Sequence, residues 1–332
     1  MSNARVHTPS RERSPTPEPV LPPLVVIAGA TATGKTALSL GLADAIPGAE
    51  IISADSRQVY RGMDVGTAKV SAADRGRAPH HGLDLVDPDH AFTAADYLQA
   101  AIDALHAIAA RGGVAILVGG TGLYLRAVAR GLALDETGHD PATRAELESR
   151  LVTEGLPSLV DELQRLAPTV AANTDLDNPR RVARALERAR LHGDRPPPPP
   201  RGYPARHVWI GLQVDPETHR GWIADRARAQ FAHGLLEEAA ALRERYGEAL
   251  QAFSAVGYRE AFGVLDGTLT KEEAIERTVA RTHQLARRQR TWFRAEPDIK
   301  WLDSADNSLP AAHDHVRSAG IPAHVPVVPF RG

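Results

Sequence analysis

The sequence predicts an α/β fold, in which helices cover a parallel β-sheet and a helical insertion interrupts the sheet-forming chain. Short, uninterrupted apolar segments alternate with helical segments between residues 24 and 130. This alternation is typical of parallel sheets with right-handed crossovers. From about residue 140 to 205 the chain is instead helical and charged, and an apolar segment at 208–214 then resumes the alternation. These observations predict one α/β core that carries an inserted helical domain.

The expected strands are short apolar runs, rich in β-branched residues and of the length of buried strands. They lie at 24–28, 49–53, 114–118, 208–214 and 299–302. Helices are expected at 37–45, 94–110, 123–130 and over most of 216–295. Thr93 suits the start of the second helix, and Gly112-Gly113 suits its end.

These elements divide the chain into a core and three further parts. A proline-broken leader at 1–22 is expected to be disordered, and a tail rich in proline, histidine and glycine at 306–332 is expected to be loose. The α/β core comprises 23–139 and 206–305, and the helical insertion occupies 140–205. Within the insertion, the run Pro196–Pro200 predicts a stiff, extended linker.

Composition narrows the class of protein. With 332 residues, 43% of them hydrophobic, the chain can form a substantial core. It has no cysteine, which excludes disulfides and thiolate zinc sites. No apolar run is long enough to span a membrane, and the first residues lack the apolar segment of a signal peptide. We therefore expect a cytoplasmic protein with no membrane partner, present as a monomer.

The net charge of −2 argues against a nucleic-acid partner, but it conceals two local basic clusters. Five arginines fall in each of two helical stretches: Arg180, Arg181, Arg184, Arg188 and Arg190, and then Arg281, Arg287, Arg288, Arg290 and Arg294. A locally basic face on a near-neutral protein is compatible with RNA binding. Charge alone favours the simpler interpretation, a solvated helix face with acidic partners nearby.

The strongest local motif is Gly29-Ala30-Thr31-Ala32-Thr33-Gly34-Lys35-Thr36, which fits the pattern G-x-x-x-x-G-K-[ST]. It follows a predicted strand and precedes a predicted helix, as this phosphate-binding loop requires. Its backbone N–H groups and the helix N-terminus form a cradle for anions, Lys35 adds a positive charge, and the Thr36 hydroxyl suits Mg²⁺. We expect a P-loop NTPase-like core that binds a di- or triphosphate, with Mg²⁺ as cofactor.

The strand at 114–118 ends in Gly119-Gly120-Thr121 and lacks the acidic residue with which ATPases and GTPases hold Mg²⁺ and its water. The site therefore favours holding a diphosphate over activating water at a γ-phosphate. A small-molecule kinase stays possible, since Asp55 could accept a hydroxyl proton. So does an RNA-binding module that only senses nucleotide, which would bind RNA and form no product.

A longer set of sequence blocks resembles the bacterial tRNA dimethylallyltransferase family. The resemblance runs from about residue 24 to 302 and rests on blocks that occur in one order: IISADSRQVYRGMDVGTAK at 51–69, APHH at 78–81 with Asp84 and Asp87-Pro88, LVGGTGLY at 117–124, DNPRR at 177–181, AVGYRE at 255–260 and QLARRQRTW at 284–292. Blocks this long and specific do not match together by chance.

The resemblance implies transfer of a dimethylallyl group from dimethylallyl diphosphate to N6 of the adenosine at tRNA position 37, next to the anticodon, with release of diphosphate. It implies Asp55 as the base that accepts the amine proton, and Lys35, Thr121 and Arg226 as groups that stabilise the leaving diphosphate. Around Arg226 the chain departs from the family pattern at Trp222 and Gln230, so Arg228 is the alternative.

The resemblance also implies that the target base leaves the anticodon loop and enters a pocket. The residues implied to bind tRNA are Asp55, Ser56, Arg57, Gln58, Arg144, Arg180, Arg181, Arg184, Gly257, Tyr258 and Arg259, with Val256 and Arg287-Arg288-Gln289 as further candidates. For each arginine, a surface ion pair is the simpler alternative. His80 and His81 lack a spaced third metal ligand and are expected to be structural. The sequence does not identify the apolar slot for the prenyl group.

Overall fold

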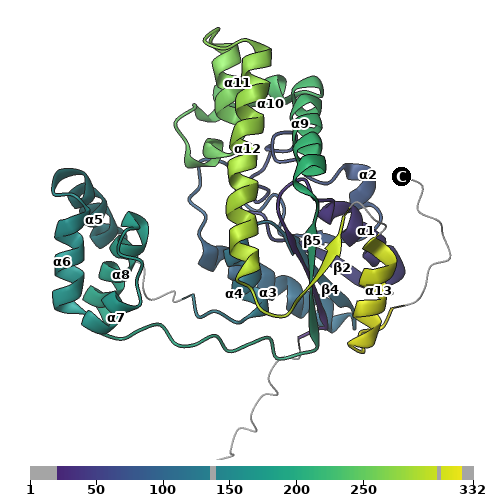
Figure 1. Cartoon of the computed structure of the whole chain (residues 1–332), viewed down its shortest axis with the longest axis horizontal. Helices are drawn as coiled ribbons and strands as arrows, with labels where there is room; N and C mark the ends of the chain where they lie inside the picture. Colours follow the sequence, from purple (N-terminus) through teal and green to yellow (C-terminus); the bar gives the residue numbers. More distant parts are fainter. Residues whose placement is uncertain (1–20, 135–139, 305–307, 324–332) are drawn as a thin grey trace, which may run out of the picture.

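The computed structural model describes residues 21–134, 140–304 and 308–323. Most of the predicted leader, and the end of the predicted tail, lie outside the described residues. Two bodies are visible, a large α/β core and a small helical body beside it (Figure 1).

The core is built on a six-stranded sheet with the strand order β3-β2-β4-β1-β5-β6. All five strand pairs are parallel. The strands are β1 Leu24–Gly29, β2 Ala49–Ser53, β3 His80–His81, β4 Val114–Gly119, β5 His207–Gln213 and β6 Ile299–Asp303. Apart from the short β3, each lies where an apolar run predicts it, because both faces of a parallel sheet are buried and favour continuous apolar sequence.

Alternate residues of β1 point to opposite faces of the sheet, and each face has its own hydrophobic core. On one face, Val25 and Ile27 pack with α1 Lys35–Ala45 and α13 Ser308–Ser318. On the other face, Leu24 and Val26 pack with α3 Ala94–Ala110 and α4 Gly122–Ala129. The core is therefore a three-layer arrangement in which the sheet is the middle layer (Figure 1).

A group of helices stands at the carboxyl edge of the sheet (Figure 1). It comprises α9 Pro216–Ala232, α10 Leu235–Tyr246, the 3₁₀ turn Gln251–Ser254, α11 Tyr258–Leu265 and α12 Lys271–Arg294. The longest, α12, begins at a capping box between Thr270 and Glu273 and packs along α9 before it reaches β1. Its side chains are thereby carried past the end of the sheet, where ligands bind in open α/β folds.

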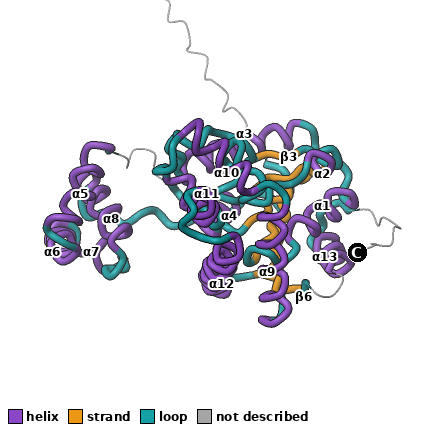
Figure 2. The backbone as a smooth tube through the Cα atoms, turned by 90° about the horizontal axis from the view of Figure 1, so that it is seen from above, coloured by secondary structure: helices purple, strands orange, loops and turns teal. Residues whose placement is uncertain are grey.

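The insertion consists of α5 Pro141–Thr153, α6 Leu156–Leu166, α7 Pro168–Ala172 and α8 Pro179–His192. These helices bury a core of their own around Leu147, Leu159, Leu163 and Leu186. From Gly193 to Arg206 the chain, including the proline run, has neither helix nor strand and returns to β5. The helical body thus lies to one side of the core, and the described segment 193–206 joins it to β5 (Figure 2).

The expectation of a loose tail from residue 306 is wrong for residues 308–318, which form α13. Its Ala312 and Val316 are buried in the core under α1, and Leu309 packs against the bare backbone of Gly41. The proline content of this segment led to the wrong prediction, because a proline such as Pro310 is well tolerated in the first turn of a helix. The short helix α2 Ala72–Arg75 was also not predicted. Among the described residues, no helix combines the length and apolar character needed to cross a bilayer.

Candidate active site at the carboxyl edge of the sheet

The glycine-rich loop joins β1 to α1, as its motif predicts. Gly34 has a φ of 79°, a left-handed conformation that suits glycine, and the Thr33 hydroxyl donates a hydrogen bond of 2.8 Å to the Ala30 carbonyl. Within the described part of the chain, no side chain caps the N-terminus of α1. The N–H groups of its first turn are therefore available to an anion.

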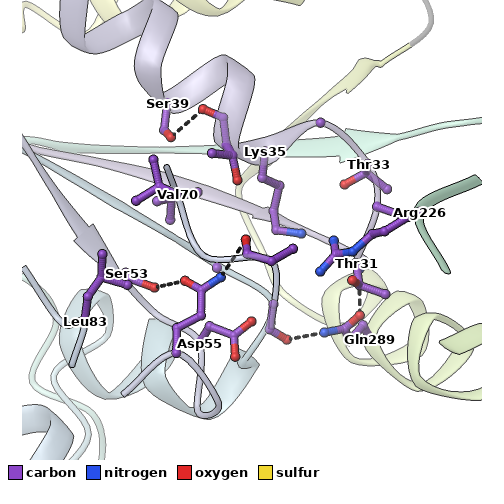
Figure 3. Close-up of a pocket in the computed structure, with 18 of the residues that line it drawn as sticks. Thr31, Thr33, Lys35, Ser39, Ser53, Asp55, Val70, Leu83, Arg226 and Gln289 are labelled. Atoms are coloured by element: carbon purple, nitrogen blue, oxygen red, sulfur yellow. Dashed lines mark hydrogen bonds between the residues drawn. The ribbon is translucent and has the colours of Figure 1, made fainter. Parts of the chain in front are cut away.

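Two cations point into the cavity beside this loop (Figure 3). The Lys35 ammonium donates a 2.6 Å hydrogen bond to the Ala30 carbonyl, and the Arg226 guanidinium lies 3.4 Å from the Thr67 carbonyl. Burial, reinforced by repulsion from Arg226 and opposed by Asp55, lowers the pKa of Lys35 to about 8. Burial also lowers the pKa of Arg226. Two desolvated cations with one carboxylate nearby make this cavity a strong anion site.

Asp55 follows the carboxyl end of β2 and lies in the same cavity (Figure 3). Its Oδ1 accepts a 2.8 Å hydrogen bond from the Arg57 backbone N–H, which fixes the carboxylate. The adjoining turn is held by Thr121, whose hydroxyl oxygen accepts from the Ser56 N–H at 3.0 Å. This packing requires glycine at 119, where a Cβ would lie 2.1 Å from the Ala54 carbonyl oxygen.

Two cavities meet at this point. The first, of about 220 Å³, is lined by the glycine-rich loop, and the second, of about 260 Å³, by Ser56, Arg57, Thr121 and the side of α12. Both cavities share Thr31, Asp55, Arg226 and Gln289. A carboxylate and a cation thus stand where a ligand in one cavity would meet a ligand in the other.

Gln289 on α12 bridges the two strand-end loops, a role that its sequence block did not reveal. Its Oε1 accepts from the Thr31 N–H at 2.8 Å, and its Nε2 donates to the Gly120 carbonyl at 2.9 Å. On the other side of the loop, buried His219 of α9 contacts the Thr31 carbonyl at 2.9 Å. Nothing in the sequence around His219 indicated this contact, which depends on how α9 and α12 pack.

The structure favours Arg226 over Arg228. Arg226 lines both cavities, whereas Arg228 is exposed and pairs with Asp225 at 3.0 Å. Gln230, one of the departures from the family pattern, donates to the carbonyls of Val65 and Gly66. It supports the loop that carries Thr67 and so helps to position Arg226.

Some residues implied to bind tRNA have other partners in the structure. Tyr258 is fully buried and donates to Glu238 at 2.7 Å, and Gly257 is buried beside it, so neither can contact RNA in this conformation. Gln58 bonds to Ser53 and to the Thr67 carbonyl within the first cavity. The expectation that Tyr258 and Gly257 contact RNA is corrected to a structural role in this conformation, because both residues are buried where α11 packs against α10.

In the helical body, Arg144 and Arg184 both pair with the carboxylate of buried Glu187, at 2.9 and 3.1 Å. Arg180 and Arg181 are exposed near the start of α8, and Arg181 lies 3.4 Å from Asp175. Arg180 and Arg181 are thus better placed than Arg144 to meet a phosphate backbone. In the core, Arg259 is exposed as well.

The oxygen donors of the first cavity suit a hard cation. Thr36, Ser53 and Asp55 line it, and Mg²⁺ prefers oxygen ligands from one or two carboxylates and from phosphates. His81 instead pairs with Glu50 and His80 with the Ala78 carbonyl, in keeping with structural roles. An exposed cluster of Asp87, Asp89 and His90 lies apart from both cavities.

Comparison with known proteins places the chain among relatives with similar sequences and folds. The sequence pattern of the IPP transferase family matches residues 58–296. A tRNA dimethylallyltransferase of a Roseiflexus species is 43% identical over 87% of this chain and 96% of its own, and one of Anaeromyxobacter dehalogenans is 46% identical over 84% and 94%. The crystal structure of a tRNA isopentenylpyrophosphate transferase from Bacillus halodurans, 37% identical, superposes with a TM-score of 0.67 over 89% of this chain and 96% of its own.

Proposed function

The chain belongs to the IPP transferase family of tRNA dimethylallyltransferases, and from this premise we propose which of its residues perform the prenylation of adenosine 37 in tRNA. One observation carries the assignment: Asp55 and Arg226 stand at the junction of an anion-binding cavity and a second cavity open to another substrate. The reactants are dimethylallyl diphosphate and tRNA, and the products are prenylated tRNA and diphosphate.

The diphosphate binds in the first cavity. Its charge is met by Lys35, Arg226 and the N–H groups at the start of α1, which are already in place before the ligand arrives. Negative charge increases on the diphosphate as the carbon–oxygen bond breaks. Preorganised cations and N–H donors in a buried site therefore stabilise the transition state more than the ground state.

Asp55 acts as the general base. The lone pair of adenine N6 is delocalised into the ring, which makes the amine a weak nucleophile. As the bond from N6 to the allylic carbon forms and the bond from that carbon to the diphosphate oxygen breaks, the N6 proton passes to the Asp55 carboxylate. Its fixed position at the junction supports this role, which typically contributes about 10²–10⁴-fold in rate.

The prenyl group lies against the apolar part of the first cavity. Val70 and Leu83 line it on the side away from Arg226 (Figure 3), and Val118 also lines the cavity. These residues come from three separate segments of the core, which explains why the sequence alone did not identify the slot.

The residues of the first cavity fit Mg²⁺, which would be held by the Thr36 hydroxyl and by oxygens of the diphosphate. When bound, the ion neutralises charge on the leaving diphosphate.

The target adenine enters the second cavity, where it meets the backbone and side chains of Ser56 and Arg57 and the basic side of α12 at Arg281 and Arg288. The rest of the anticodon region lies across the surface, where exposed Arg180, Arg181 and Arg259 are available to phosphates. Because the substrate is tRNA, we place the reaction in the cytoplasm and treat the helical body α5–α8 as a tRNA-binding domain. We also propose that the protein is a monomer.

The reaction is tested by incubating the purified protein with Mg²⁺, unmodified tRNA and dimethylallyl diphosphate, followed by mass analysis of the nucleosides. The expected result is a gain of one dimethylallyl group on the adenosine next to the anticodon. Phosphate transfer from ATP, with no prenylated nucleoside, would instead support the kinase interpretation. RNA binding without any product would support the nucleotide-sensing module.

A further inference from the structure

A third cavity lies on the other side of α12 from the second. Its volume is about 680 Å³, and it is enclosed by the carboxyl ends of β5 and β6, the start of α9 and the last turns of α12. Helix α12 lies between the two cavities, and two adjacent arginines of this helix line different ones: Arg288 lines the second cavity and Arg287 lines the third. Lys35, Asp55 and Arg226, to which the proposed function gives roles in prenyl transfer, do not line this third cavity.

One wall of the third cavity is cationic. Arg287, Arg290 and Arg294 follow one another at intervals of three and four residues, which places them on one face of α12, and all three line the cavity. Within residues 21–134, 140–304 and 308–323, none of the three forms an ion pair with a carboxylate. Among the described residues, the hydrogen-bond partner of the Arg290 side chain is His219, at 2.9 Å. Like charges at this spacing repel one another, so a bound anion would relieve the repulsion.

The opposite wall is apolar and aromatic. It is formed by Leu212, Val214 and Pro216 around the end of β5, and by the half-buried ring of Trp301 on β6. The ring packs close to the backbone of Gly211 on β5, where a Cβ would lie 2.6 Å from the Trp301 Cε3 atom. Of the two carboxylates on the rim, Asp215 accepts hydrogen bonds from the N–H groups of Glu217 and Thr218 at the start of α9, and Asp303 also has a partner.

We propose that the third cavity binds an organic phosphate, with the phosphate on the arginines of α12 and the organic group against Trp301. Guanidinium groups bind phosphate oxygens in a bidentate manner, and three of them on one helix face match a single phosphate or diphosphate. The apolar wall adds contact area that inorganic phosphate cannot use. This proposal does not depend on the prenyl-transfer reaction.

The cavity also touches the anion loop of the active site. Because Nδ1 of His219 accepts from Arg290, its Nε2 carries the proton and donates to the Thr31 carbonyl. Arg290 therefore supports the loop as well as the third cavity, and its removal would disturb both. Arg287 and Arg294, which have exposed side chains and no such contact, are the appropriate residues to change.

The test uses the full chain carrying Lys35→Ala, so that the active-site loop does not capture the probe. Isothermal titration calorimetry with geranyl monophosphate is expected to show one site per chain, binding at least about tenfold more tightly than inorganic phosphate because of the buried apolar group. Adding Arg287→Ala and Arg294→Ala is expected to weaken this binding by about tenfold or more, since two charged contacts are lost. Trp301→Ala is expected to remove most of the preference for the ester.

Arg277→Ala is the matched control, because Arg277 is an exposed arginine of the same helix that lines none of the three cavities. It should leave the affinity for geranyl monophosphate unchanged. Absence of binding to the Lys35→Ala chain would overturn the proposal, as would equal binding with and without Arg287 and Arg294. If those two arginines affect only tRNA affinity, they are RNA contacts and the proposal is wrong. Prenylation by the unaltered chain is measured separately and decides the proposed function alone.

Discussion

The Lys35 ammonium and the Arg226 guanidinium face the same cavity, and their repulsion adds to burial in lowering the pKa of Lys35 to about 8. Each cation is therefore poised to accept a dianionic or trianionic partner. In the absence of that partner, the arrangement is unfavourable for the folded protein. Binding affinity at this site is gained at the expense of stability.

Affinity for dimethylallyl diphosphate should fall as pH rises through about 8, because the diphosphate binds best to protonated Lys35. The group is charged below this pKa and neutral above it, so the loss lies on the alkaline side. The apparent Kd for inorganic diphosphate, measured between pH 6 and 10, tests this. In Lys35→Arg the guanidinium stays protonated, and the alkaline decline should move beyond the tested range. An identical decline in that variant would assign it to another group.

As pH rises, the stability of the folded protein should increase, whereas the affinity for the diphosphate decreases. The pKa of Lys35 is lower in the folded state than its ordinary value of 10.5, so the folded protein carries the full penalty of the buried charge below about pH 8 and loses it as pH rises toward 10.5. Lys35→Met should therefore raise the Tm at pH 7, and the gain should shrink at pH 10. A lower Tm at pH 7 would show that the Ala30 contact outweighs the cost of burial.

Asp55→Asn should keep tRNA binding and lose roughly 10²–10⁴-fold of turnover, because it removes the proton acceptor and little volume. Single-turnover prenylation and a tRNA-binding assay measure the two effects separately. Ser53, which lies nearby and bonds to Gln58, offers a control: Ser53→Ala changes the same cavity without removing a base. Near-normal turnover of Asp55→Asn would eliminate Asp55 as the base.

Gln289→Ala should raise the KM for dimethylallyl diphosphate by about tenfold, since the two hydrogen bonds that tie the anion loop at Thr31 to the Gly120 loop are lost. Gln289→Glu should be worse, because a carboxylate cannot donate to the Gly120 carbonyl and repels the diphosphate. The KM for tRNA should change less than the KM for the diphosphate. Equal effects of both variants on tRNA alone would place Gln289 in RNA recognition instead.

Arg180→Ala with Arg181→Ala should weaken tRNA binding and flatten its dependence on salt concentration, because each phosphate contact releases counterions. Arg144→Ala should instead lower the stability of the helical body, because it leaves buried Glu187 with one ion-pair partner fewer. Arg228→Ala is a matched control, as Arg228 is exposed and already paired with Asp225. An unchanged salt slope in the double variant would exclude these arginines as phosphate contacts.

The sequence predicted most of the fold because the information is local. A buried parallel strand is a continuous apolar run, and the glycine-rich motif lies between a strand and a helix. The positions of β1, the loop and α1 could therefore be predicted together. The position of α13 was not, because its burial depends on contacts with α1, more than 260 residues earlier in the chain. Arg226 was placed through the resemblance rather than through its own surroundings.

The sequence identified the charged residues of the candidate site, but it did not identify the residues that hold the glycine-rich loop in place. Motif residues such as Lys35 and Asp55, which are far apart in the sequence, line the same cavity. The roles of Gln289 and His219 come from helices that meet the loop only in the folded chain. Conversely, Arg144 and Tyr258 carry the right chemistry for RNA but are engaged by Glu187 and Glu238. Sequence shows which groups are present, and packing decides which of them are available.

The meeting of two cavities at Asp55 has a kinetic consequence. In the proposed function each reactant has its own cavity, so neither has to leave before the other enters, and no covalent intermediate on the protein is required. Diphosphate can depart while the modified anticodon loop is still bound. A new molecule of dimethylallyl diphosphate can then bind at the glycine-rich loop before the next tRNA arrives. Under the proposed function, the exchange of the small reactant therefore does not have to wait for the exchange of the large one.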